Sequence, residues 1–340
     1  MIDTQRGMAI ETRKVQQTGG STYVISLPKQ WANKAGIRTG ACVYLHPQSD
    51  GTLVIDPTNE APKLKEKKID VTGIMGDSLT RDIIAAYLTG YDIIDLSAKR
   101  ILAEQKKTIR QVCYKLMGPE IIEETAKNVI IQDLLNPQEI SIKKGVRRMF
   151  LISSSMHKDA VRALKNSDVD LAQDVIQRDD EVDRLFLLIS KQFRSVLRGG
   201  RLPGASETSI DEYHDYRMAA SPLERIADHA QRIAKIATEM NYSIPEDALN
   251  LIEDASETSR KIVEDAVNAL FSADVKLAND VIDRVEKRRP QISHLNELLL
   301  KLESPLSVIA LRTVADSIDR TGDYGSNIAE IAINSAMGLS

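Results

Sequence analysis

Two acidic pairs, each with members four positions apart, carry the clearest chemical signal in the sequence. Asp179 and Asp183 form the first pair, and Glu224 and Asp228 form the second. On a helix, side chains with this spacing project from one face, with about 5–6 Å between their Cβ atoms. The four carboxylates would repel one another unless a positive charge lies between them. They would also supply the hard oxygen ligands that divalent and trivalent metal ions prefer.

The first pair falls on a helix face that the sequence predicts to be buried. At about 100° per residue, both aspartates lie within the arc of an apolar set. That set comprises Val175, Ile176, Val182, Phe186 and Leu187. A charge on a buried face needs a partner, either a basic side chain or a bound cation. The alternative to a metal site is therefore a solvated acidic face paired with Arg178, Arg184 and Arg225. Recurrence of the pair in an internal repeat favours the metal site.

The internal repeat divides the C-terminal part of the chain into two halves. The segment 171–178 reappears at 277–284, and the segment 224–228 reappears at 319–323. The second copy adds Asp319 and Asp323 as a third acidic pair. Breaks in the helical pattern after Pro137 predict six long helices, three in each half. Two three-helix bundles, over residues 138–241 and 245–338, are the simplest architecture that fits.

Other kinds of catalytic or cofactor site lack their signatures. Redox di-iron sites in helical bundles need Glu-x-x-His pairs, and none of the five histidines follows a glutamate at that spacing. The sequence has no glycine-rich nucleotide-binding run. Cys42 and Cys113 have no metal-ligand spacing, and we expect both to be buried. His229 points about 100° away from Asp228 and is interpreted as a structural residue. We therefore expect no enzyme activity.

The charge is distributed unevenly along the chain. Its 340 residues carry a net charge of −4 and are 42% hydrophobic but only 4% aromatic, which is typical of a globular protein with an aliphatic, largely helical core. Residues 5–49 hold six basic residues and one acidic residue. This basic head on an acidic body predicts a contact with nucleic acid. The sequence shows no membrane span and no signal peptide, so we expect a cytoplasmic protein without membrane insertion.

Two smaller regions precede the helices. In the head, residues 1–60, the Gly19-Gly20 turn predicts a β-hairpin, and a short helix with two further strands follows it. Residues 66–135 alternate between strand and helix patterns and end in a second hairpin. They form a small α/β module whose role the sequence does not indicate. The fold class is therefore multidomain, with a β domain, an α/β module and an all-α pair of three-helix bundles.

The helical region, about residues 138–338, resembles the PhoU family of phosphate-signalling proteins. The segments 179–183, 224–230 and 319–330 look like that family's Glu/Asp-x-x-x-Asp signatures. The resemblance implies metal clusters on the bundles, with iron or zinc as the first candidates and magnesium or manganese as others. The implied metal ligands are Asp179, Asp183, Glu224, Asp228, Asp319 and Asp323. Val285 and Arg289 replace the first two in the second bundle, so we expect that site to be incomplete.

Residues 11–57 resemble SpoVT/AbrB-type domains. The matching runs are Arg13–Val15, Gly19-Gly20, Tyr23–Pro28, Gly36-Ile37 and Gly40. The resemblance implies a swapped-hairpin β domain that binds DNA as a homodimer. Ser21, Ala32 and Asn33 stand where DNA-binding members have arginine. Arg13, Lys14 and Lys29 remain as the candidate phosphate contacts.

Together, the two resemblances predict a regulator of phosphate uptake. The protein would bind DNA and regulate transcription, contact the phosphate transporter ATPase or a signalling protein, or do both. The alternative is a helical metal-storage or redox protein that carries a dimerisation domain. Metal content, together with oxygen-dependent oxidation of ferrous iron, would distinguish the two.

Overall fold

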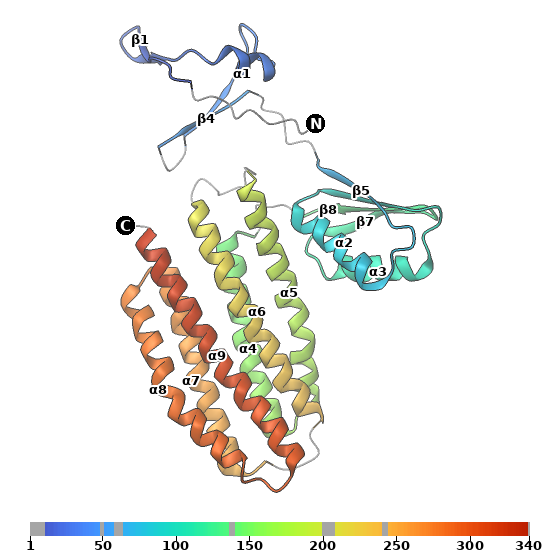
Figure 1. The fold of residues 1–340 in the computed structure, drawn as a ribbon, viewed down its shortest axis with the longest axis vertical. Helices are drawn as coiled ribbons and strands as arrows, with labels where there is room; N and C mark the ends of the chain where they lie inside the picture. The colour runs from blue at the N-terminus through green and yellow to red at the C-terminus, as the bar shows by residue number, and fades with distance from the viewer. Residues whose placement is uncertain are drawn as a thin grey trace, which may run out of the picture. The chain divides into compact units, whose positions relative to one another are not determined.

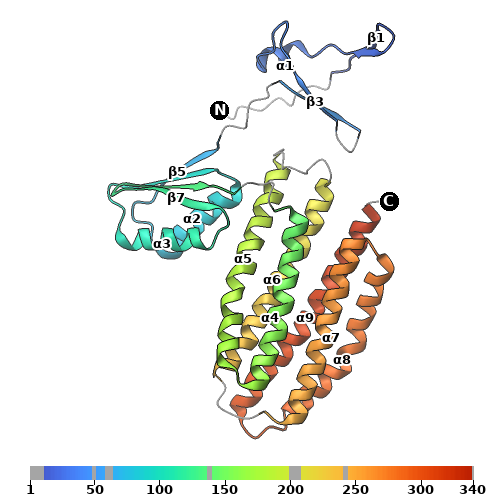
Figure 2. The same ribbon diagram turned by 180° about the vertical axis from the view of Figure 1, so that it is seen from behind.

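The fold is taken from a computed structural model of the chain (Figures 1 and 2). The structure describes residues 11–47, 51–57, 64–135, 140–198, 208–239 and 244–338. Internal contacts divide the chain into two units, Met1–Lys63 and Leu64–Ser340.

The N-terminal unit consists of two small hairpins with a short helix between them. Strand β1 (Gln16–Thr18) pairs antiparallel with β2 (Thr22–Val24). Gly19 and Gly20 both adopt positive φ in the turn, a conformation that costs glycine little. Helix α1 (Lys29–Lys34) follows, and β3 (Tyr44–Pro47) then pairs antiparallel with β4 (Leu53–Asp56). These elements confirm the predicted hairpin, helix and strands.

This unit has no interior of its own within its described part. No residue of 11–47 or 51–57 is buried. Tyr23 is 72% exposed, and Ile25 and Leu45 are each more than half exposed. Cys42 is also exposed, so the expectation that it is buried was wrong. A single chain supplies no second layer against which these hairpins can pack.

The α/β module opens the second unit. Its elements in order are β5 (Glu66–Asp70), α2 (Gly76–Thr89), β6 (Ile93–Ser97), α3 (Ala103–Tyr114), β7 (Pro119–Glu124) and β8 (Asn128–Asp133). The sheet order is β5-β6-β8-β7, with a parallel β5-β6 pair and antiparallel pairs elsewhere. Helices α2 and α3 lie on the same face of the sheet (Figure 1). Their buried residues, such as Leu79 and Ile109, share a core with Leu96 and Ile131 of the sheet.

Six long helices form the rest of the unit, as the sequence predicted. The first bundle contains α4 (Ile142–Asn166), α5 (Val169–Leu197) and α6 (Ile210–Glu239), and the second contains α7 (Glu246–Ser272), α8 (Val275–Leu299) and α9 (Pro305–Gly338). Helices α6 and α9 also pack on each other, so one continuous core extends through both bundles. None of the described helices is both long and apolar enough to cross a membrane.

The internal repeat extends to the turns between helices. The residue that follows α4, Ser167, has a φ of 52°, and the residue that follows α7, Ala273, has a φ of 53°. The next residue is an aspartate in both places. The side chains of Asp168 and Asp274 each cap the following helix by accepting a hydrogen bond of 3.0 Å from a leucine N–H. Such caps typically stabilise a helix by about 1 kcal/mol.

The α/β module packs along one side of α5. The ammonium of Lys191 forms an ion pair with Asp133 and lies 4.5 Å from the ring centroid of Tyr87. Burial lowers the pKa of Lys191 to about 8. Further along α5, Arg198 donates a hydrogen bond of 2.6 Å to the carbonyl of Thr89, and Leu187 packs against the module's core. The module is therefore attached to the first bundle by both apolar and charged contacts.

Candidate metal centre and nucleic-acid surface

The structure brings the first two acidic pairs together. Asp179 and Asp183 come from α5, and Glu224 and Asp228 come from α6, which packs along α5. We call these four residues the first acidic cluster. Asp179 is buried, with 8% exposure, as the apolar arc predicted, whereas Asp183, which was predicted to lie on the same buried face, is exposed. Its carboxylate accepts a hydrogen bond of 2.7 Å from the side-chain amide of Gln231.

The carboxylates of the first acidic cluster lie close enough to affect one another's ionisation. Burial, followed by the charges of Asp183 and Asp228, raises the pKa of Asp179 to about 7. Partial burial and Asp228 also raise the pKa of Asp183 and that of Glu224. Each shift has the sign expected when negative charges are crowded together in a partly desolvated place. A bound cation would relieve this repulsion.

The arginines considered as neutralising partners are mostly directed elsewhere. Arg178 forms ion pairs with Asp159 and Asp174, at 2.7 and 2.8 Å. Arg184 donates a hydrogen bond of 3.4 Å to the carbonyl of Leu116 in the module. Arg225 lies 3.6 Å from Glu224 and is largely exposed, so water screens most of that attraction. These three arginines therefore neutralise little of the first acidic cluster, and the charges of Lys235 and Lys115 only partly offset the raised pKa values of Asp179 and Asp183.

The four carboxylates of the first acidic cluster are chemically suited to bind a metal ion, but the structure does not hold them in a coordinating arrangement. Four carboxylates offer the hard oxygen ligands of a divalent or trivalent cation. Within the described residues, no three His, Cys, Asp or Glu side chains are arranged to hold an ion. A cation would therefore have to draw the side chains of the first acidic cluster inward.

The third acidic pair already has an internal cation. Arg288 on α8, only 4% exposed, places its Nη1 2.6 Å from Asp319 Oδ1 and its Nη2 2.9 Å from Asp323 Oδ1. Its Nη2 also donates to the backbone carbonyl of Asp319 at 2.6 Å. Arg289, which the sequence repeat assigned to this place, is instead exposed and pairs with Glu286. Asp319 and Asp323 therefore do not form a metal site equivalent to the first acidic cluster.

The two buried histidines of the helical region, His157 and His229, make packing contacts between helices. His229 is 8% exposed, and its ring centroid lies 5.7 Å from that of Tyr324 on α9. His157 is fully buried, with its Nδ1 3.3 Å from the hydroxyl of Ser256. Burial lowers the pKa of His157 to about 3. These contacts join the two bundles.

The candidate DNA contacts all lie on the surface of the N-terminal unit. Arg13, Lys14 and Lys29 are exposed. Arg13 forms an ion pair with Glu11, two positions earlier on the same segment. A phosphate at Arg13 would therefore compete with this carboxylate. Lys14 and Lys29 have no such contact among the interactions of the described residues.

Models of known protein families match both the N-terminal and the C-terminal part of the chain. A model of the PhoU domain matches residues 146–237 and 252–332, which together make up half of the chain. The chain belongs to the PhoU family. A model described as "Antidote-toxin recognition MazE, bacterial antitoxin" matches residues 16–63, so a MazE/AbrB-type domain precedes the PhoU domain.

Relatives of the PhoU domain are found in several bacteria. A "Phosphate-specific transport system accessory protein PhoU homolog 2" from Thermotoga maritima is 27% identical over 218 residues, covering 60% of this chain and 88% of that protein. A PhoU homologue from Pseudomonas putida is 30% identical, covering 52% of this chain and 70% of that protein. Crystal structures of PhoU from Pseudomonas aeruginosa and Streptococcus pneumoniae share the fold. Both have a TM-score of 0.52, with 24% and 18% identity, and cover 58% of this chain and 96% and 94% of those chains.

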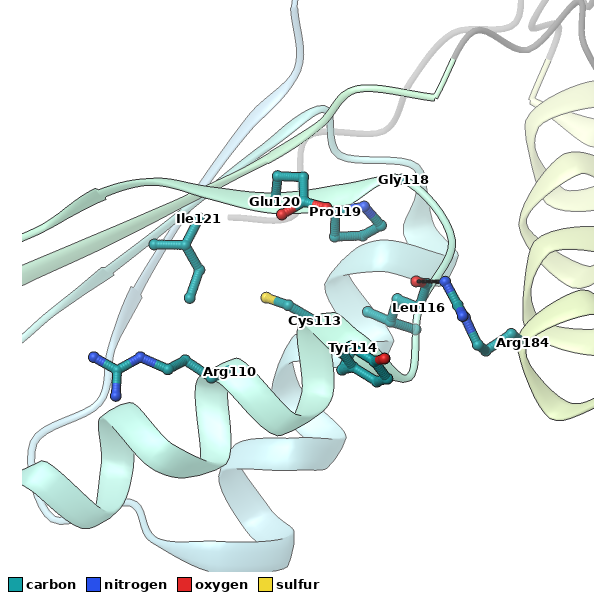
Figure 3. Close-up of a pocket in the computed structure, with 9 residues that line it drawn as sticks. All are labelled: Arg110, Cys113, Tyr114, Leu116, Gly118, Pro119, Glu120, Ile121 and Arg184. Carbon is teal, nitrogen blue, oxygen red and sulfur yellow. Dashed lines mark hydrogen bonds between the residues drawn. The ribbon is translucent and has the colours of Figure 1, made fainter. Parts of the chain in front are cut away.

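The α/β module lies outside both family matches, which leave residues 64–145 uncovered. A cavity of about 310 Å³ lies beside α3 and β7, and Arg184 of α5 reaches its edge (Figure 3). The thiol of Cys113 points toward this space. Burial raises the pKa of Cys113 to about 12, so the thiol stays protonated near neutral pH and lacks the thiolate that reactive cysteines need.

Proposed function

We propose that this protein regulates phosphate uptake, with its PhoU domain as the sensing or adaptor part and its head as the DNA-binding part. The family of the helical domain supports the first half of this proposal, because the relatives that it matches are named as accessory proteins of phosphate-specific transport. Its partner in the cell would be the phosphate transporter ATPase or a signalling protein. The relatives are accessory proteins rather than enzymes, which supports a non-catalytic role and disfavours metal storage.

The head supports the second half of the proposal. Its hairpins expose apolar side chains, including Tyr23, Ile25 and Leu45, and bury none of the described residues. A second copy of the same domain would cover this surface, as expected for a homodimer. Dimerisation would also double the number of exposed basic side chains, so that Arg13, Lys14 and Lys29 of both copies could contact phosphates along one DNA duplex.

The first acidic cluster supports a metal-dependent PhoU domain. Because the pKa values of Asp179, Asp183 and Glu224 are raised, these carboxylates would gain from a cation, and iron, zinc, manganese or magnesium would each suit oxygen ligands to a different degree. The cation would neutralise the partly buried acidic cluster between α5 and α6. A partner protein that recognises this face would then distinguish the metal-loaded form from the metal-free form.

The experiment that tests the proposal is recovery of DNA bound to the protein in its own cells, grown with ample phosphate and under phosphate starvation. We expect enrichment of a few promoter regions, including those of phosphate-uptake genes, in one of the two conditions. The same promoter enrichment in both phosphate conditions, or no enrichment in either, would contradict the proposal.

The purified protein allows a sharper test of the head. Each phosphate contact contributes about 0.9 to the slope of log K against log salt. The Arg13→Ala/Lys14→Ala variant should therefore flatten the slope by at least about two units in a dimer. The matched control is Lys99→Ala/Arg100→Ala, which removes two exposed neighbouring basic residues from the α/β module. An equal slope for the head variant and the parent would remove the head from the DNA contact.

A further inference from the structure

A cavity with an unusual combination of linings is formed by residues of α2, α5 and α6; in the ribbon, α2 lies beside α5 (Figure 1). Its volume is about 580 Å³. Leu88 of the module forms one wall, and side chains from α5 and α6 form the others. The cavity is distinct from the first acidic cluster, none of whose four residues lines it.

Two arginines in this cavity form no ion pair with any residue that the structure describes, although the charge of Glu224 partly offsets the lowering of the pKa of one of them, Arg217. These are Arg194 of α5 and Arg217 of α6, and both line the cavity. They lie close enough that Arg194, after burial, helps to lower the pKa of Arg217. The third arginine in the lining, Arg198, is anchored to the carbonyl of Thr89, which accepts a hydrogen bond but carries no charge. Among the described residues, the lining therefore contains three arginines and no acidic residue.

The remaining walls are apolar and aromatic. The guanidinium of Arg217 lies 4.5 Å from the ring centroid of Phe186. The rings of Phe193 and His214 form a tilted pair with centroids 5.8 Å apart. Met218 is 47% exposed at the cavity, and methionine adapts its shape readily to an apolar ligand. These walls suit a carbon skeleton but offer a bare inorganic ion nothing to pack against.

We propose that this cavity binds a small organic anion, with its negative group held between Arg194 and Arg217 and its apolar body packed on Phe186, Phe193 and Met218. Arginine binds carboxylate and phosphate oxygens with paired donors, so either acidic group would satisfy the two guanidinium groups. Predominantly apolar walls combined with a small number of placed polar or charged groups are the usual composition of a small-molecule site. An anion here would also end the repulsion between the two arginines.

The experiment uses the full-length protein and the anionic fluorophore 8-anilino-1-naphthalenesulfonate as a probe. Octanoate and phenyl phosphate are the competitors, and they distinguish a carboxylate ligand from a phosphate ligand. Inorganic phosphate supplies charge without an apolar body, and 1-octanol supplies the apolar body without charge. We expect at least one of the organic anions to displace the probe at concentrations at least tenfold below those needed for inorganic phosphate or octanol.

Matched variants locate the site. Arg217→Gln should weaken binding of the effective anion at least tenfold, and Arg194→Gln, at an exposed position, should act in the same direction. The control Arg232→Gln removes an exposed arginine from the same helix, away from the cavity, and should change the affinity less than twofold. Thermal unfolding of each variant shows whether it is folded. If Arg217→Gln is unfolded, Arg194→Gln decides the outcome.

Three results would overturn the proposal. The first is equal displacement by octanol and by the organic anions, which would indicate a merely apolar surface. The second is equal loss of affinity in Arg232→Gln and Arg194→Gln, which would indicate general attraction to positive charge. The third is failure of the parent protein to bind any of the anions at millimolar concentration.

Discussion

The guanidinium of Arg288 occupies the space that a side chain on Gly322 would fill. A Cβ atom on Gly322 would lie 2.5 Å from Arg288 Cζ, far closer than two carbon atoms can approach. The repeat places Val182 and Ala227 at the corresponding positions of the first bundle, where both are buried. The second bundle thus has an arginine against a glycine where the first bundle has a valine and an alanine. As a result, the guanidinium of Arg288 fits against Gly322 and neutralises the third acidic pair.

The first prediction follows from this difference between the bundles. Gly322→Ala should destabilise the protein by about 1–3 kcal/mol, because the added methyl group overpacks the site. In the background Arg288→Val, which restores the valine of the first bundle, the same substitution should cost close to nothing. Urea unfolding of the parent, the two single variants and the double variant measures this coupling. Additive effects would show that the two positions do not interact.

Arg288→Val alone should also be destabilising, because it leaves Asp319 and Asp323 without their cation. The loss of stability should be smaller than the roughly 3–5 kcal/mol typical of a fully buried ion pair, because the side chains of Asp319 and Asp323 are 37% and 40% exposed and remain partly solvated. Arg289→Val removes the neighbouring exposed arginine and serves as the control. A larger loss in Arg289→Val than in Arg288→Val would contradict the ion pairs described above.

The sequence predicted the helical architecture well because its signals are local. Helix breaks, apolar periodicity and the repeat fixed six helices in two bundles without any knowledge of long-range contacts. The same reasoning misplaced one residue. Alignment of the repeat pointed to Arg289, whereas the buried stripe of α8, which runs through Val281, Val285 and Ile292, includes Arg288. An arginine at a stripe position indicates a buried charge that needs a partner, and this signal could have been read from the sequence.

The head shows the opposite case. Its hairpins and helix were predicted from turn residues and β-branched runs, but nothing local could show how its apolar side chains become buried. The anion cavity was missed for a related reason. Arg194 and Arg217 lie on different helices, and Leu88 belongs to the module, so only the tertiary fold brings them together.

The second prediction concerns the pH dependence of the metal-free protein. The folded-state pKa of Asp179 is raised to about 7, so the folded state binds this proton more tightly than the unfolded state does. Stability is therefore lost as the pH rises from about 4 to about 7, on the order of 2 kcal/mol between pH 5 and pH 8. Asp179→Asn should gain stability relative to the parent across this range, as measured by urea unfolding in the presence of a chelator.

The comparison with the parent at each pH is essential, because His157 acts in the opposite direction. Its pKa is lowered to about 3, so its contribution is lost as the pH falls below about 6.5. This contribution is the same in both proteins and cancels in the difference. Asp254→Asn, at an exposed position on α7, is the control and should give a difference that is independent of pH. A flat difference for Asp179→Asn would show that Asp179 titrates normally.

The third prediction concerns assembly through the head. Burial of a large apolar side chain contributes about 1.5–3 kcal/mol to the free energy of association. In a symmetric dimer, each such residue is buried once in each subunit, so its contribution is doubled. Tyr23→Ser/Ile25→Ser should therefore raise the dimer dissociation constant at least about 100-fold in analytical ultracentrifugation. Leu306→Ser removes a residue of the PhoU domain that is 75% exposed and should leave assembly unchanged. A dimer that survives deletion of residues 1–63 would place the interface in the second unit.

The fourth prediction separates the two bundles by their metal content. Asp183→Asn/Asp228→Asn removes one carboxylate from each helix of the first acidic cluster and should abolish most of the metal bound to protein purified without chelator and supplied with iron or zinc. Asp319→Asn/Asp323→Asn removes the same number of carboxylates from the second bundle. It should change the metal content little, because Arg288 already neutralises that pair at 2.6 and 2.9 Å. Elemental analysis per chain gives the measurement.

A measurement of stability distinguishes loss of a metal ligand from damage to the fold. Four crowded carboxylates repel one another without a cation, so Asp183→Asn/Asp228→Asn should be at least as stable as the parent when both are metal-free. Asp319→Asn/Asp323→Asn should instead be less stable, because it leaves the buried charge of Arg288 without its partners. The two double variants make the same chemical change, so opposite effects on the free energy of unfolding would be explained by the position of Arg288. Equal metal loss in both variants, or a parent that binds no metal, would contradict the proposed site.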